Sequence, residues 1–420
     1  MPRLFLTALA TTALTALPAF AVEKTDVLTT YADIAAAKYE DSLVAAQDLQ
    51  ATIEAFLAAP SDSTLDAART AWRDARVPYM QTEVYRFGNP MVDDWEGRVN
   101  AWPLDEGLID YVDATYGGAT DENEFAALNV IANTTFTLSG QTVDSSQITP
   151  ALLADTLQEA DGVEANVATG YHAIEFLLWG QDLNGTGPGA GNRPWTDYAS
   201  GDACTGGNCD RRADYLRVST DMLVDELAFM TAAWGEGGDA RTAVLADDNR
   251  GISMMLTGMG SLSYGELAGQ RMKLGVLLND PEEEHDCFSD NTQFSHYYDG
   301  VGIQNIYLGS YTRTDGTVVS GPSLNDLLAE ADAGVAGQLG DDIAASVVAL
   351  GDIVTATENG MAYDMMLARD NAEGEALILG AVDKLVIQTR SIERAVTALE
   401  LGVIELEGSD SLDAPDAVFQ

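Results

Sequence analysis

The sequence predicts an all-α protein made of two helical-bundle domains. Apolar residues recur at helical intervals over most of the chain, and strand-like alternation is limited to short pieces near residues 134–138 and 317–320. A glycine- and proline-rich stretch at 184–210 separates two such regions. We therefore expect a signal peptide at 1–21, a first bundle at 22–200, a second bundle at 201–407 and an acidic tail at 408–420.

Each predicted helix rests on a run of alanine, leucine and isoleucine spaced by three or four positions. The first run ends at the breaker Pro60-Ser61-Asp62-Ser63. The segments that meet this criterion are 31–57, 64–87, 148–179, 211–234, 251–278, 323–339, 341–369 and 374–406.

The first residues read as a secretion signal. Arg3 precedes an apolar stretch that runs to Leu17, and Ala19-Phe20-Ala21 has the form that signal peptidase accepts. No cysteine follows at the junction, so a lipid anchor is not expected. No later segment is long and apolar enough to span a bilayer. These features predict a protein of the Gram-negative periplasm with no membrane span.

The chain is strongly acidic, with 67 Asp and Glu against 21 Lys and Arg and a formal net charge of −46. Such a surface repels nucleic acid and anionic lipid, so neither is an expected partner. It attracts cations towards any cleft. For most of the charge, however, adaptation of the surface to salt is the favoured explanation.

Three cysteines are present. Cys204 and Cys209 share a loop rich in glycine and aspartate, and an oxidising compartment favours a disulfide between them. A zinc site there is disfavoured because no second pair of ligands lies nearby. Cys287 is left as an unpaired thiol.

The most informative motif is the pair His172 and Glu175 in the apolar run 170–180. Residues three apart project from one face of a helix, and an ionisable pair among apolar residues is costly to bury unless each member has a partner. A metal ion is one such partner, and a plain hydrogen-bonded pair is the other reading. The two remaining histidines, His285 and His296, could reach a site between the domains, but surface or structural roles are expected for them. Asp286 and Asp290 could also join such a site, although loop structure explains them adequately.

Glu83 and Asp105 are the additional metal ligands that we expect, because iron accepts carboxylates beside an imidazole. An ion pair with Arg86 is the alternative for Glu83. For Asp105 the alternative is a helix N-cap before residues 106–112. Spacing alone does not decide whether Asp105 or the adjacent Glu106 is the metal ligand.

The halves of the chain are weakly similar, which suggests a degenerate duplication. When they are aligned, Asp364 falls on Glu175 but Met361 falls on His172. Only the first half keeps its imidazole, so a single site near the interface of the two domains is expected.

Several segments together resemble the imelysin family, also described as iron-regulated periplasmic proteins. The similar stretches extend from about residue 30 to about residue 310 and are highly specific in their order and number. They are Ala71–Tyr79, Gln81–Glu83, Val99–Asp105, Gly170–Glu175, Gly187–Gly189, Arg193–Tyr198, Gly265–Ala268 and Phe288–Thr292.

The resemblance implies two helical bundles with a GxHxxE motif near their interface, here Gly170, His172 and Glu175. The family was first described as metallopeptidases and later tied to iron uptake. A related metal-binding domain occurs in periplasmic components of iron-transport systems. The implied partners are therefore a metal ion, iron rather than zinc, and envelope iron-transport components.

Three functions remain open from the sequence. The leading hypothesis is a periplasmic metal-binding protein that serves iron uptake or homeostasis. The second is a metallopeptidase with Glu175 as its catalytic residue, although the chain has neither HExxH nor HxxEH and a peptidase needs an unfamiliar ligand set. The third is a non-catalytic partner-binding module in which His172 and Glu175 form a purely structural pair.

Overall fold

The structure is a computed structural model that describes residues 21–120 and 123–419, and within them helices dominate, as predicted. The predicted signal peptide, 1–21, lies outside the described residues except for Ala21 and stays a prediction. The helices of the first half are α1 (Lys24–Ala58), α2 (Asp62–Met80), α3 (Pro90–Glu96), α4 (Glu106–Ile109), α5 (Pro150–Leu152) and α6 (Gly170–Trp179). The later helices are α7 (Cys209–Trp234), α8 (Asp239–Leu245), α9 (Asp248–Ser261), α10 (Leu274–Leu278), α11 (Thr292–Leu308), α12 (Leu324–Glu358), α13 (Tyr363–Met366), α14 (Ala372–Ala398) and α15 (Asp410–Asp413).

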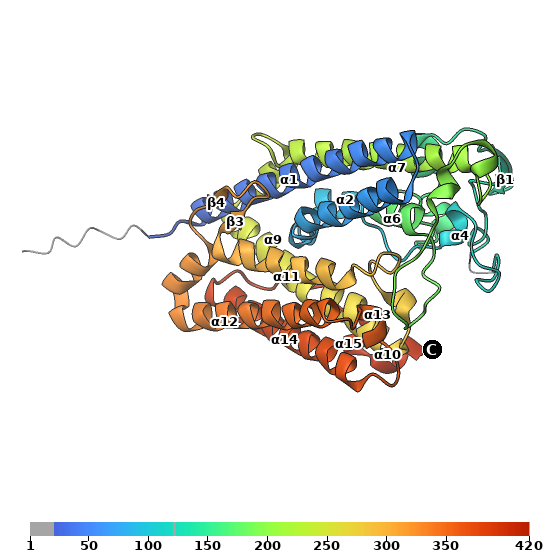
Figure 1. Ribbon diagram of the computed structural model, residues 1–420. Coiled ribbons are helices and arrows are strands. Elements are labelled where there is room, and N and C mark those ends of the chain that lie inside the picture. Colours follow the sequence, from blue (N-terminus) through green and yellow to red (C-terminus); the bar gives the residue numbers. More distant parts are fainter. Residues whose placement is uncertain (1–20, 121–122, 420) are drawn as a thin grey trace, which may run out of the picture.

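Long helices form the two outer sides of the molecule (Figure 1). On one side α1 packs along α2 and α7, and on the other α12 packs along α14. Helix α11 contacts both α12 and α2, so it joins the two sides through the middle. Helix α2 begins with a reciprocal cap between Ser61 and Thr64, which satisfies two backbone N–H groups at its first turn.

The main hydrophobic core contains residues from both halves of the sequence, among them Trp72, Trp179, Met259 and Ile303. A smaller apolar cluster includes residues of α12 and α14, among them Leu350 and Leu385. The division into domains at residues 22–200 and 201–407 stays a prediction.

The predicted helix 148–179 is not continuous. After α5 come a short π-helical turn at Leu153–Leu157 and a 3-10 turn at Ala160–Gly162, and α6 begins only at Gly170. Glu159 and Asp161 have φ values of +52° and +57°, which an α-helix does not tolerate. Conversely, the two segments predicted at 323–339 and 341–369 are not separated near residue 340. Both fall largely within α12, whose interruption lies instead at a kink at Asp332, with φ −154° and ψ 98°.

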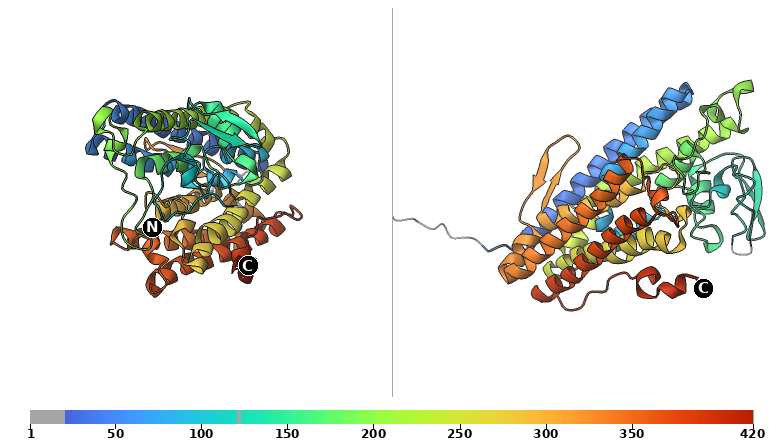
Figure 2. Two further views of the ribbon diagram at one scale, coloured as in Figure 1. Left: turned by 90° about the vertical axis from the view of Figure 1, so that its right-hand side faces the viewer. Right: turned by 60° about the horizontal axis from the view of Figure 1, so that its bottom comes forward.

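Both predicted strand pieces form, each in an antiparallel hairpin. β1 (Thr135–Leu138) pairs with β2 (Gln141–Asp144), and β3 (Ser310–Thr312) pairs with β4 (Val318–Ser320). Figure 2 shows the β3–β4 hairpin projecting beside α1.

The predicted disulfide between Cys204 and Cys209 is present, and Cys287 is unpaired. Among the residues that the structure describes, no helix is both long and apolar enough to cross a membrane.

Candidate metal centre

Helix α6 carries the pair that the sequence singled out, and it is buried on every face. Gly170 begins it with a φ of +83°, and a Cβ atom there would lie 2.4 Å from the carbonyl oxygen of Val99. The Tyr171 amide donates a 2.7 Å hydrogen bond to that same carbonyl. Only glycine allows this close approach, which explains the first position of the GxHxxE motif.

His172 and Glu175 face each other one turn apart, as the spacing predicts. The Nδ1 atom of His172 lies 3.0 Å from Oε2 of Glu175, and the Ser289 amide donates to Oε1 at 3.0 Å. Both carboxylate oxygens are therefore engaged. The Nε2 atom of His172, by contrast, has no hydrogen-bond partner among the described residues.

The loop between α10 and α11 brings two further ligand-type side chains to this pair. His285 and Asp286 lie more than a hundred positions along the chain from α6, and both are fully buried. The loop is fixed at Asp286, whose amide donates to Thr292 Oγ1 at 3.0 Å. The Oδ2 atom of Asp286 accepts hydrogen bonds from Asn291 and Ser295.

His172, His285 and Asp286 form the one cluster of potential metal ligands found among the described residues. One donor atom from each lies within 4.8 Å of the other two. The rings of His172 and His285 meet edge to face with centroids 4.7 Å apart. This is a set of two imidazoles and one carboxylate.

Arg76 of α2 supplies a positive charge beside the cluster. Its guanidinium donates to Asp286 Oδ1 at 2.8 Å and lies 3.4 Å from His285 Nδ1. Burial alone would raise the pKa of Asp286, but the charge of Arg76 holds it below its usual value. Asp286 is therefore ionised, and its Oδ1 keeps a lone pair that Arg76 does not use.

Burial keeps the histidines uncharged. Desolvation, reinforced by Arg76, lowers the pKa of His172 to about 3. Desolvation and then Arg271 lower the pKa of His285 well below its ordinary value. Neutral imidazole is the form that binds a metal ion, so both rings are ready as ligands at neutral pH. Burial and then the neighbouring Asp286 raise the pKa of Glu175 well above its ordinary value.

His296 of α11 completes a row of all three histidines of the chain. Its ring stacks near His285, with centroids 6.5 Å apart, and meets Tyr363 edge to face at 5.3 Å. Neither ring nitrogen of His296 has a hydrogen-bond partner among the described residues. The interior beside the cluster is therefore unusually rich in unpaired polar atoms.

Glu83 and Asp105, the other predicted ligands, lie outside this cluster. Glu83 is buried in a 3-10 turn after α2, and its carboxylate pairs with Arg271 at 2.7 Å instead of with Arg86. Asp105 occupies the N-cap position of α4 but caps no backbone amide with its side chain. Its carboxylate accepts hydrogen bonds from Tyr116 and Asn123. A metal-binding role for either residue stays a prediction.

Sequence reasoning allowed His285 and Asp286 to reach the site but did not choose them as ligands, and it favoured surface or structural roles for His285 and His296. Both histidines lie in the interior. The signal in the sequence is the scarcity of histidine. The chain has only three histidines, and the structure brings all three together.

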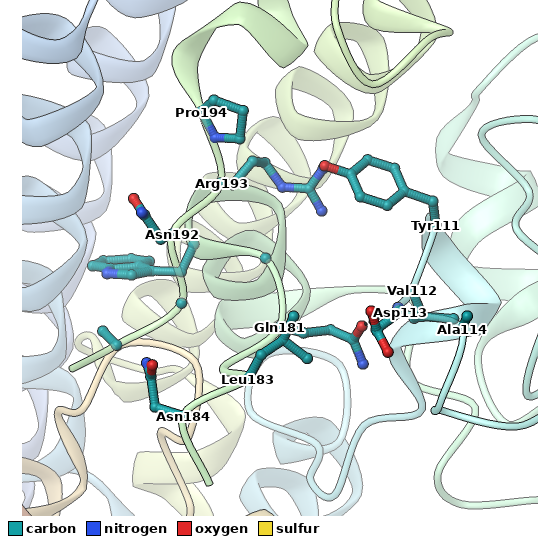
Figure 3. A pocket seen from close by; sticks show the side chains of 14 residues that line it. Tyr111, Val112, Asp113, Ala114, Gln181, Leu183, Asn184, Asn192, Arg193 and Pro194 are labelled. Carbon is teal, nitrogen blue, oxygen red and sulfur yellow. Dashed lines mark hydrogen bonds between the residues drawn. The ribbon is translucent and has the colours of Figure 1, made fainter. Parts of the chain in front are cut away.

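A separate pocket of about 420 Å³ opens beyond the C-terminal end of α6 (Figure 3). Tyr111, Gln181, Asn192 and Arg193 line it, and Arg193 is paired with Asp110 at 2.7 Å. None of the three clustered ligands lines this pocket. The cluster is therefore distinct from this pocket.

Comparisons of this chain with known proteins all indicate the same family. The chain resembles "Iron-regulated protein A" of Synechococcus elongatus, with 28% identity over 126 residues, which is 30% of this chain and 35% of that protein. The match thus spans about a third of the relative.

Two solved structures share the fold. A protein of Parabacteroides distasonis described as an iron-regulated protein A precursor has a TM-score of 0.63 at 17% identity, covering 90% of this chain and 95% of its own. An imelysin-like protein of Psychrobacter arcticum has a TM-score of 0.59 at 16% identity, covering 92% and 100%. A family model described as Imelysin (Peptidase_M75) matches residues 35–392. The chain belongs to the imelysin family.

Proposed function

We propose that this protein binds a divalent transition-metal ion, iron(II) foremost, through His172, His285 and Asp286. The observation that carries the proposal is the buried set of two neutral imidazoles and one carboxylate, with donor atoms within 4.8 Å of one another. Two histidines and one carboxylate are the donor set of non-haem iron(II) proteins, in which the remaining positions stay open.

The residues fit a cation in two respects. When Glu175 is ionised it accepts the Nδ1 hydrogen of His172, and Nε2 then carries a lone pair that no described residue uses. A bound cation favours this ionised form, because it opposes the burial that raises the pKa of Glu175. An imidazole lone pair buried without a partner is costly, and a metal ion removes that cost. Arg76 opposes the ion electrostatically, but it keeps Asp286 ionised when no metal is bound.

Glu175 has the role of a positioning carboxylate in this proposal. Metal-binding histidines commonly donate their second nitrogen to a carboxylate, which fixes the ring and its tautomer. Here Oε2 of Glu175 lies 3.0 Å from Nδ1 of His172 and fixes the ring. The Ser289 amide donates a hydrogen bond to Oε1 and fixes Glu175 in turn.

We place this activity in the periplasm, in iron uptake or homeostasis, with components of envelope iron transport as partners. The similarity to an iron-regulated protein supports the iron context, and the secretion-type first residues support the compartment.

A metallopeptidase is the alternative, because three protein ligands with an open position also describe catalytic zinc sites. Two observations favour binding over hydrolysis. Both oxygens of Glu175 are already hydrogen-bonded, and the three ligand side chains are almost fully buried. Chelator-sensitive cleavage of an unfolded substrate that disappears in Glu175→Ala would establish the peptidase instead.

Calorimetric titration with iron(II) under anaerobic conditions tests the proposal. We expect one ion per native chain and no binding to a His172→Ala/His285→Ala variant. Asp352→Asn is the control, because it alters an exposed carboxylate of α12 that is not part of the cluster, and it should leave the affinity unchanged. Equal binding heats for the native protein and the double variant would reject the site. Native stability that does not respond to metal would indicate a purely structural pair.

A further inference from the structure

A polar cleft of about 560 Å³ leads from the surface to His285. One wall is formed by α3 and the segment that follows it, and the other by Glu266, Gln270 and Arg271. His285 lines the cleft although its side chain is almost wholly buried, so its ring belongs to the innermost wall. The cleft therefore reaches one member of the proposed ligand set, His285, while His172 and Asp286 do not line it.

The cleft is acidic. Six carboxylates line it against two guanidinium groups, and both guanidinium groups are already paired. Arg86 lies 3.0 Å from Asp93 and 3.5 Å from Glu266, and Arg271 lies 2.7 Å from Glu83. The carboxylates are Asp93, Asp94, Glu96, Glu159, Glu164 and Glu266.

Three of these carboxylates are unneutralised. Asp94, Glu159 and Glu164 are exposed, and no ion pair or side-chain hydrogen bond holds them among the described residues. Burial raises the pKa of the inner Glu96 to about 7, so most of the negative charge lies at the outer rim. We call Asp94, Glu159 and Glu164 the rim carboxylates.

An unpaired buried amide marks the inner end of the cleft. Asn100 is 2% exposed and lines the cleft, and its Nδ2 has no hydrogen-bond partner among the described residues. Its Oδ1 accepts a 2.5 Å hydrogen bond from Arg76, the same arginine that contacts Asp286. Trp102 covers the other side, with its ring centroid 5.8 Å from that of His285. Polar contacts thus connect the cleft to the ligand set.

We propose that this cleft is the access route of the metal and that it admits a hydrated cation while repelling anionic metal chelates. The inference rests on the proposed function and adds to it the chemical form of the cargo. A cleft lined by one sign of charge concentrates ions of the opposite sign and accelerates their association. Added salt screens this attraction, because its range is about 10 Å at 0.1 M ionic strength.

Stopped-flow tryptophan fluorescence with cobalt(II) as the probe measures the association rate directly, with Trp102 beside the site as a reporter. The test variant is Asp94→Asn/Glu159→Gln/Glu164→Gln. The control is Asp352→Asn/Glu375→Gln/Asp383→Asn, which removes three exposed charges on α12 and α14 that do not line the cleft. At low salt we expect the rim variant to associate about 3- to 10-fold more slowly, within the range of electrostatic steering. The dissociation rate should be unchanged, and the difference should shrink in 0.3 M salt.

Equal association rates for the rim and control variants, with affinity intact, would overturn the route but leave the proposed function standing. Uptake of intact ferric dicitrate by the native protein as readily as cobalt(II) would also overturn it. Failure of the native protein to bind any cation would reject both proposals.

Discussion

Two buried charged clusters in this protein differ in what they leave unpaired. In the first, Asp110 accepts from Arg212 through Nε at 2.6 Å and a terminal nitrogen at 2.9 Å, and from Arg193 at 2.7 Å. Each oxygen of Asp110 thus faces a guanidinium. The polar atom left over there is Nε of Arg193, an N–H donor, which cannot bind a cation.

In the candidate metal centre the unpaired atoms include nitrogens of imidazole rings, beside the Nε donor of Arg76. His172 Nε2 and both nitrogens of His296 lack partners among the described residues. Buried charge alone therefore does not distinguish a structural cluster from a functional one. The distinction lies in whether lone pairs remain once all internal hydrogen bonds are counted.

The largest expected effect is on the cluster around Asp110, which we call the saturated cluster because both oxygens of Asp110 accept hydrogen bonds from guanidinium groups. Asp110→Asn removes the negative charge between two buried guanidinium groups, which should lower the free energy of unfolding by about 3–5 kcal/mol. Urea unfolding measures this loss. The folded variant should bind iron(II) with native affinity, and a parallel loss of affinity would remove the contrast between the clusters.

His285→Ala should show the opposite pattern. It removes one proposed ligand, so iron(II) affinity should fall by more than about 100-fold, beyond the 10- to 100-fold typical of losing a residue that only orients a ligand. Because His285 makes only long polar contacts, the metal-free protein should remain folded. Titration and thermal unfolding of the same sample separate these quantities. Native affinity in this variant would exclude His285 as a ligand.

Glu175→Gln sharpens the distinction between a ligand and its support. The amide keeps the shape of the side chain but weakens its hold on Nδ1 of His172. Affinity should therefore fall by about 10- to 100-fold, less than for His285→Ala. A loss equal to that of His285→Ala would make Glu175 a direct ligand, as the sequence first suggested.

Measured per pH unit, the change in the pH dependence of stability is the smallest effect. Burial and then Arg271 lower the pKa of His296 to about 3, so between pH 6.5 and 3 the unfolded chain binds the extra proton. The stability that depends on the neutral His296 ring is fully present above pH 6.5 and is lost as the pH falls towards 3. His296→Phe should reduce the slope of stability against pH in this window by about 1.4 kcal/mol per unit.

The saturated cluster provides the comparison for this slope. Burial opposes ionisation of Asp110, but Arg193 and then Arg212 hold its pKa below the usual value near 3.8, so its contribution is lost only under more acidic conditions. Urea unfolding at a series of pH values resolves the two windows. An unchanged slope between pH 6.5 and 4.5 in His296→Phe would show that this ring titrates normally.

Local signals explain which parts of the fold and site were predictable. Helical periodicity located the long helices, and a spacing of three placed His172 beside Glu175. Residues joined by tertiary structure carry no such signal. Asp286 reaches the site through a loop held by Thr292, and Glu83 pairs with Arg271 almost two hundred positions away. Positive φ values at Glu159 and Asp161 interrupt a segment whose apolar pattern favours one helix.

The most direct test is anomalous diffraction at the iron edge from crystals grown anaerobically with iron(II). We predict one peak per chain, bonded to His172, His285 and Asp286, with Glu175 still on Nδ1 of His172. A peak coordinated by Glu83 or Asp105, or no peak at the three clustered residues at saturating iron, would contradict the account.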